Sequence, residues 1–101
     1  MDFAQMFGKL QEAQQKMEEV KLRLDDIQVT GEANGVVIIV TGNRKLVNVD
    51  IAESLIAEGD KEQIEDLITI AFNRAIENAD HVNESEMKSI AGGMLPGFPG
   101  L

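Results

Sequence analysis

The chain of 101 residues has no cysteine, tryptophan or tyrosine, and it has only two prolines and one histidine. Without cysteine it cannot form a disulfide, use a thiolate nucleophile or offer thiolate ligands to a metal, which suits a reducing compartment. No apolar run approaches the roughly 20 residues that cross a bilayer, and Asp2 stands where a signal peptide carries positive charge. We therefore expect a cytoplasmic protein without a membrane partner.

Positive charge is also scarce. Nine Lys and Arg stand against eighteen Asp and Glu, for a net charge of −9, which at first sight argues against nucleic acid as a partner. With 44% apolar and 27% charged residues, the chain can still form one small core. We expect a single domain over residues 1–91. A tail rich in Gly and Pro follows over residues 92–101.

The first segment has the pattern of a long helix. Apolar residues recur every seven positions in two series that are offset by three residues. The first series is Phe3, Leu10, Met17 and Leu24, and the second is Met6, Ala13, Val20 and Ile27. This pattern predicts one helix over residues 2–27. Such a helix would run roughly 39 Å, longer than a compact globule of this size is wide. It therefore needs a partner.

Three strands and a second helix follow. Asn34-Gly35 predicts a type I′ turn between strands at 28–33 and 36–41, and the second of these is apolar on both faces, as in a central strand covered on each side. A third strand at 46–51 alternates apolar and polar residues, and residues 54–56 read as a connector. Asp60 and Gln63 resemble a capping box for a helix that stops at Gly92-Gly93. The pattern predicts an α+β fold, α-β-β-β-α, with a small antiparallel sheet.

The sequence contains few residues that could form a catalytic site. His81 lies among polar residues and reads as a solvated side chain rather than a general base. The acidic residues between 60 and 66 lack the ligand spacing of a calcium loop. We expect no catalytic residue, no metal, no cofactor and no small-molecule substrate.

The few basic residues occupy particular positions. The sequence predicts a basic stripe on the first helix, formed by Lys9, Lys16 and Arg23 at the heptad g positions, while Glu18, Glu19, Asp25 and Asp26 fall at b and c. Such a stripe either forms ion pairs between helices or gives a polyanion a local cationic surface. Arg44 and Lys45, adjacent in a turn, are a second candidate contact, with a solvated turn as the alternative.

The order of motifs resembles the YbaB/EbfC family of bacterial nucleoid-associated proteins. The motifs are a long helix, Val29-Thr30-Gly31-Glu32, the Asn34-Gly35 hairpin, Asp60-Lys61-Glu62, Ala71-Phe72-Asn73 and Gly93-Met94-Leu95-Pro96-Gly97-Phe98. The resemblance implies an intertwined homodimer whose protruding helices hold duplex DNA, changing its conformation or compaction and influencing gene expression. It implies a place at the nucleoid.

The resemblance also suggests which residues contact DNA. The family's basic residues on the first helix correspond to Lys9, Lys16 and Arg23, and Arg74 is the comparable residue on the second. No aromatic residue interleaves the stripe, so we expect contacts with the duplex backbone and little sequence selectivity. The expected dimer interface comprises Phe3, Met6, Leu10, Met17, Val37 and Ile39. The alternative is a dimeric adaptor that binds replication, recombination or transcription proteins.

Overall fold

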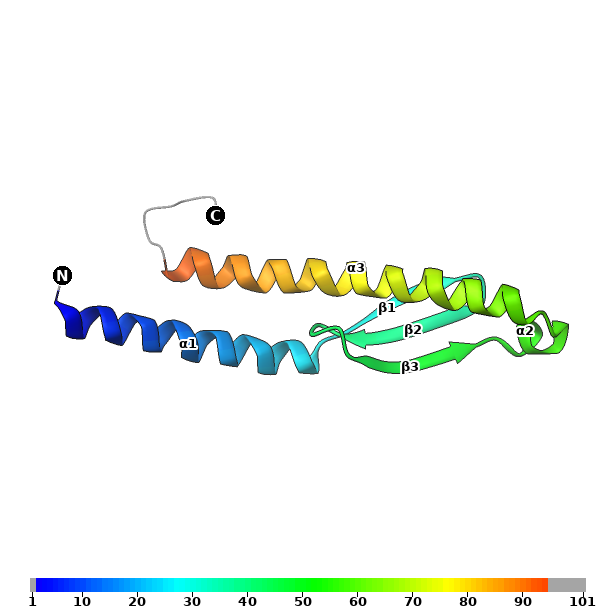
Figure 1. Cartoon of the computed structure of the whole chain (residues 1–101), viewed down its shortest axis with the longest axis horizontal. Helices are drawn as coiled ribbons and strands as arrows, with labels where there is room; N and C mark the ends of the chain where they lie inside the picture. Colours follow the sequence, from blue (N-terminus) through cyan, green and yellow to red (C-terminus); the bar gives the residue numbers. More distant parts are fainter. Residues whose placement is uncertain (1, 95–101) are drawn as a thin grey trace.

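The computed structural model describes residues 2–94 as two long helices joined to a small sheet (Figure 1). The elements are α1 (Phe3–Asp26), β1 (Gln28–Ala33), β2 (Val36–Thr41), β3 (Leu46–Ile51), α2 (Glu53–Glu58) and α3 (Lys61–Met94). The molecule is elongated, with principal extents of 68 × 23 × 17 Å. The sheet and α2 occupy one end, and α1 and one half of α3 run antiparallel toward the other (Figure 1). The predicted α+β architecture is confirmed.

α1 matches the helix predicted over residues 2–27 to within one residue at each end. The Asp2 side chain accepts a hydrogen bond from the Ala4 N–H at 3.4 Å, and Ile27 turns into extended backbone at the other end. The heptad seam is buried only near its end, at Val20 and Leu24. Among the described residues, the long helix therefore packs against the rest of the chain only along its last turns.

The sheet is antiparallel in the order β1-β2-β3, as the sequence predicts. The β1–β2 hairpin turns at Asn34 and Gly35, which have φ of 36° and 99°. A type I′ turn needs positive φ at both residues, and Asn-Gly tolerates it best. The register pairs Ala33 with Val36 and Val29 with Val40.

The two faces of β2 differ. Val36, Ile38 and Val40 are buried beneath α3 in the core, whereas Val37 and Ile39 lie half-buried on the opposite face. β2 is the central strand, as predicted. The described chain supplies a helix layer on one face only.

α3 approaches β1 very closely. Its residues Ala71, Ala75 and Ala79 are fully buried. A Cβ built on Gly31 would clash with the Ala71 carbonyl oxygen and the Ala75 backbone nitrogen. Small residues on both elements therefore hold the helix against the strand.

Two local predictions need correction. Residues 54–56, predicted as a connector, belong to α2, a short helix that ends where Gly59 adopts φ of 71°. α3 begins as predicted, with the Gln63 N–H donating to Asp60 Oδ1 at 3.1 Å. It does not stop at the glycine pair, however, but continues to Met94, because glycine costs a helix only about 1 kcal/mol.

The rest of the predicted tail, residues 95–101, lies outside the described residues. Within the described part of the chain, none of the helices combines the length and the apolar character that a membrane span needs.

Candidate nucleic-acid interface

α1 displays Lys9 and Lys16 on its exposed surface. The seven-residue spacing separates them by two turns, roughly 10.5 Å along the axis. Both side chains are exposed, and among the described residues neither takes part in an ion pair. These two ammonium groups are therefore available to an external anion.

Arg23, the third residue of the basic stripe, has an internal partner. Its guanidinium Nη2 lies 2.8 Å from Glu86 Oε2 on α3, so the pair links α1 to α3. The Arg23 side chain is still 57% exposed. Arg23 thus forms an ion pair between helices, which was one reading of the stripe, whereas Lys9 and Lys16 are exposed cations and their role as a surface for a polyanion stays a prediction.

The turn between β2 and β3 brings Arg44 and Lys45 to the same region. Arg44 adopts φ of 67°, and its Nε donates to Asp80 Oδ1 on α3 at 2.6 Å. Lys45 Nζ lies 3.7 Å from Asp25 Oδ1 at the end of α1. The pair is therefore not simply solvated: each residue has a carboxylate partner.

Asparagines complete this junction, which we define as residues 21–25, 41–45 and 80–86. The Asn43 side chain donates to the Lys21 carbonyl oxygen at 2.8 Å and to Asp25 Oδ1 at 2.7 Å. Asn83 donates to the Gly42 carbonyl oxygen at 3.4 Å. Sequence reasoning missed these residues because their partners lie far away along the chain, where spacing carries no signal.

Arg74 lies apart from the junction. Its Nη1 donates to the Glu32 carbonyl oxygen on β1 at 2.6 Å. The structure thus brings Arg23, Arg44 and Lys45 together and places Arg74 over the outer edge of β1.

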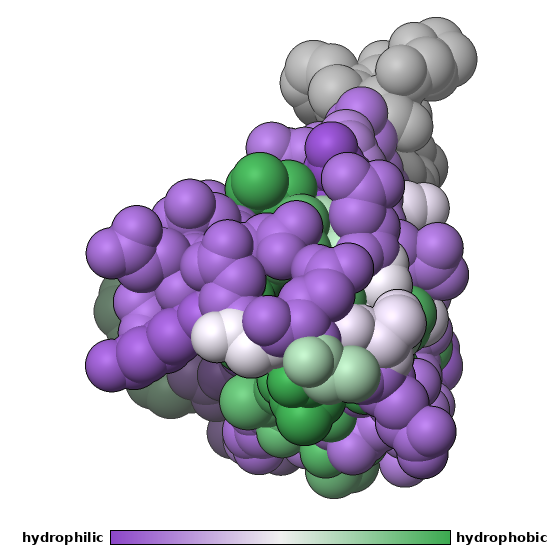
Figure 2. Space-filling model, turned by 90° about the vertical axis from the view of Figure 1, so that its right-hand side faces the viewer, coloured by the Kyte–Doolittle hydropathy of each residue, from purple (hydrophilic) through white to green (hydrophobic). Residues whose placement is uncertain are grey.

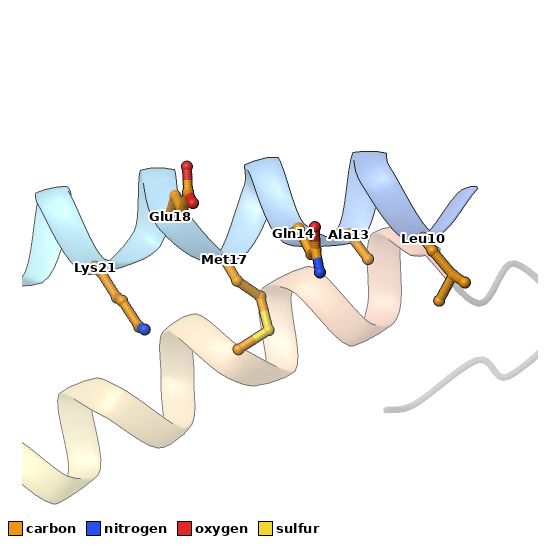
Figure 3. Close-up of a pocket in the computed structure, with 6 residues that line it drawn as sticks. All are labelled: Leu10, Ala13, Gln14, Met17, Glu18 and Lys21. Atoms are coloured by element: carbon orange, nitrogen blue, oxygen red, sulfur yellow. The ribbon is translucent and has the colours of Figure 1, made fainter. Parts of the chain in front are cut away.

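An open groove runs along α1 beside α3. It is lined by Leu10, Ala13, Gln14, Met17, Glu18 and Lys21. Figure 3 shows Met17 and Lys21 pointing from α1 toward the side on which α3 runs, while Glu18 points away. The groove supplies apolar surface and one cation, without a converging set of reactive groups.

The described residues contain neither a buried histidine nor a cluster of metal ligands. His81 is exposed on α3. Within residues 2–94 there is no cluster of three or more His, Asp or Glu side chains that could hold a metal ion. The chemistry of the site is therefore that of exposed cations on a helix.

The residues expected at a dimer interface lie on two surfaces. Four of them line the open part of the α1 seam and are exposed, from 77% for Phe3 to 40% for Met17. Met6 and Leu10 fall between these values. Val37 and Ile39 lie on the sheet face that α3 leaves uncovered.

Comparisons with known proteins place relatives over nearly the whole chain. Residues 1–94 match the model of a family described as the YbaB/EbfC DNA-binding family. A nucleoid-associated protein of Flavobacterium johnsoniae is 43% identical over 103 aligned positions, which cover all of this chain and 95% of that protein. A nucleoid-associated protein of Rickettsia bellii is 37% identical, covering 97% of this chain and 95% of its own length.

A solved structure shares the fold. It is that of an uncharacterized protein from Helicobacter pylori, with a TM-score of 0.82 and 22% sequence identity. The match covers 91% of this chain and 99% of that chain.

Proposed function

Because the chain belongs to the YbaB/EbfC DNA-binding family, we propose that it is a homodimer that binds duplex DNA through backbone contacts. It has little sequence selectivity, alters the conformation or compaction of the DNA and thereby influences gene expression. Its place is the nucleoid within the cytoplasm. The observation that carries the proposal is that Lys9 and Lys16 on α1 are exposed and form no ion pair with another residue in the described part of the chain.

Part of the net charge of −9 lies too far from the α1 lysines to oppose this contact, because charge is screened over distance. The Debye length is about 8 Å in physiological salt. The acidic residues of α2 and of the first turns of α3 lie at one end of a molecule 68 Å long, and the beginning of α1 lies at the other (Figure 1). The α1 lysines therefore act on DNA largely independently of that distant charge.

The remaining basic residues contribute less. Arg23, Arg44 and Lys45 each lie beside a carboxylate, so a phosphate must compete with that partner. Arg74 stabilises the sheet edge. We rank Lys9 and Lys16 first, Arg23, Arg44 and Lys45 second, and Arg74 last.

Dimerisation doubles the cations that one assembly presents to DNA. Two features support it: the α1 seam keeps large apolar side chains exposed along its first turns, and the described residues place no covering layer over one face of the sheet. A heptad seam is a known route to association between helices. The proposed contacts are Phe3, Met6, Leu10 and Met17 on α1, with Val37 and Ile39 on the sheet.

Reversing both lysine charges tests the proposal. With Lys9→Glu and Lys16→Glu combined, we expect binding to a labelled duplex to be abolished in fluorescence anisotropy, while the mass by light scattering stays that of the wild type. The mechanism is the loss of phosphate contacts, which supply most of the sequence-independent affinity.

A matched pair of single variants controls for net charge. Lys16→Glu and Lys61→Glu change the charge equally, but Lys61 lies at the start of α3, where it pairs with Glu65 at 3.6 Å. We expect Lys16→Glu to weaken binding and Lys61→Glu to leave it close to wild type. Undiminished binding by the double variant would overturn the placement of the site.

A further inference from the structure

The first turns of α1 extend beyond the end of α3 (Figure 1). The two helices run antiparallel, and the Arg23–Glu86 ion pair marks a point at which they are level. From Glu86 to Met94, where α3 ends, the helix rises roughly 12 Å, the distance along α1 from Arg23 back to about residue 15. The first two turns of α1 therefore have no helix beside them among the described residues.

An apolar stripe runs along this part of α1. Residues spaced alternately by four and three positions share one face of a helix. Five such residues, which we name the α1 stripe, are Phe3, Phe7, Leu10, Gln14 and Met17. All five are exposed, and Phe3, Phe7 and Leu10 reach 77%, 58% and 61%. The ring centroids of Phe3 and Phe7 lie 6.3 Å apart, so these two side chains form one apolar patch.

α1 packs against α3 with a different face. On that face Ala13 is half-buried, and Val20 and Leu24 are buried. Helical spacing turns it by roughly 80° from the α1 stripe. Leu10 and Met17 of the stripe also line the open groove described above, so stripe and groove form one continuous surface (Figure 3).

The uncovered turns of α1 lack the packing that usually stabilises a helix. Isolated helices shorter than about 12–15 residues are marginal in water, and most helix stability in proteins comes from packing an apolar face. Contiguous exposed apolar side chains often mark a binding surface. A cover over the α1 stripe would therefore stabilise the first turns of α1, which also carry Lys9.

The residues that follow Met94 have the composition of such a cover. They contain no charge and carry large apolar side chains at every third position: Leu95-Pro96-Gly97-Phe98-Pro99-Gly100-Leu101. A polyproline II helix has three residues per turn, so in that conformation Leu95, Phe98 and Leu101 share one face. The sequence thus supplies an apolar stripe complementary to that of α1.

The length of this segment also matches. Seven residues at about 3.1 Å each span roughly 22 Å, and α1 measures roughly 18 Å from residue 15 back to Phe3. α3 points toward the beginning of α1 where it ends (Figure 1). A segment that continues in this direction brings Phe98 level with the turns that carry Phe3 and Phe7.

We propose that residues 95–101 dock on the α1 stripe of the same chain, with Phe98 against Phe3 and Phe7. The contact goes beyond the proposed function, because it needs neither DNA nor a second subunit. It covers the apolar patch and holds the first turns of α1 in helical form.

Another apolar surface lies at the α2 end of the molecule. Seen from that end, apolar residues gather in the lower part, which is the side of β3 in Figure 1 (Figure 2). This surface lies beyond the β2–β3 turn, which Arg44 joins to Asp80, roughly 21 Å along α3 from Met94. Seven residues span at most about 25 Å, so only the last of them would reach it.

A second copy of the chain is the other candidate to cover the α1 stripe, since Phe3 and Leu10 are among the proposed dimer contacts. Residues 95–101 are attached to α3 beside the stripe, which gives them an effective concentration on the order of millimolar. They therefore compete successfully with a separate subunit for these two residues, and the dimer keeps its other proposed contacts.

A single tryptophan tests the docking, because the wild-type chain has neither tryptophan nor tyrosine. A peptide of residues 95–101 with Phe98→Trp gives the emission of an exposed indole. We expect Phe98→Trp in the full chain to emit at a shorter wavelength than this peptide, because docking removes the indole from water. Emission equal to that of the peptide would overturn the proposal.

A matched pair of second substitutions locates the contact. Phe7→Lys puts a charge into the α1 stripe, whereas Leu22→Lys makes the same change at a residue that is 67% exposed and lies roughly 22 Å farther along α1. In the Phe98→Trp chain, Phe7→Lys should return the emission to that of the peptide, and Leu22→Lys should leave it unchanged. No response to Phe7→Lys would place the segment elsewhere and overturn the proposal.

Mixing distinguishes docking within the chain from docking on a second copy. The chain with both Phe98→Trp and Phe7→Lys is unfolded and refolded together with an excess of wild type, which has no tryptophan. We expect its emission to stay that of the peptide. A return to shorter wavelength would place the segment on α1 of a second copy and overturn the assignment. None of these measurements contains DNA, so failed docking is distinguishable from a failed lysine site.

Discussion

Gly31 shows how a single residue controls the fit between sheet and helix. It has no side chain at the point where α3 passes over β1, and the Ala71 and Ala75 backbone occupies the space that a Cβ would need. We expect Gly31→Ala to destabilise the protein by about 1–3 kcal/mol or more, because the clash is with backbone that cannot rotate away. Thermal or urea unfolding followed by circular dichroism measures this change.

Gly8 is the matched control for that substitution. It lies in α1, and an added Cβ meets none of the described residues within 4 Å. We expect Gly8→Ala to stabilise the chain by about 0.5–1 kcal/mol, since alanine favours a helix over glycine. Equal effects at the two positions would contradict the close approach of α3 to β1.

In the junction, carboxylates pair with basic residues that we propose as secondary DNA contacts. Glu86 lies 2.8 Å from Arg23, so a phosphate reaching Arg23 must displace a carboxylate. Glu86→Gln removes that competitor and should tighten DNA binding about two- to fivefold, the equivalent of roughly 0.5–1 kcal/mol for an exposed ion pair.

Glu65→Gln controls for the added charge, because Glu65 pairs with Lys61 at 3.6 Å, away from α1. Anisotropy titrations of both variants at equal salt provide the comparison. Tightening by Glu65→Gln equal to that by Glu86→Gln would mean that net charge, and not release of Arg23, is responsible.

Elements with strong local patterns were predictable from sequence. The α1 heptads and the Asn34-Gly35 turn each depend on neighbours along the chain, and both agree with the structure. The predictions of a connector at residues 54–56 and of a helix end at Gly92-Gly93 were wrong. Both depended on helix propensities, and those of ordinary residues and glycine differ by only about 1 kcal/mol.

The candidate site was predictable only in part. Heptad spacing identified Lys9 and Lys16 as aligned residues, and they are exposed. The partner of Arg23 lies 63 residues away, so no local pattern could show that its charge is engaged. The uncovered first turns of α1 likewise depend on where α3 ends beside them, which tertiary packing decides.

The whole molecule is acidic and elongated, and we propose that it binds DNA through a few exposed lysines. Neutralising each phosphate releases counterions, so log K falls with log salt by about 0.9 per contact. Lys9 and Lys16 of one subunit predict a slope of about −1.8, and those of both subunits predict about −3.6.

Fluorescence anisotropy of the wild-type protein with two unrelated labelled duplexes, at salt concentrations from about 25 to 200 mM, tests this claim most directly. We predict saturable binding to both duplexes with similar affinity and a slope within that range. A flat, non-saturating signal at the lowest salt would contradict it, showing that the acidic charge prevails and directing attention to a protein partner.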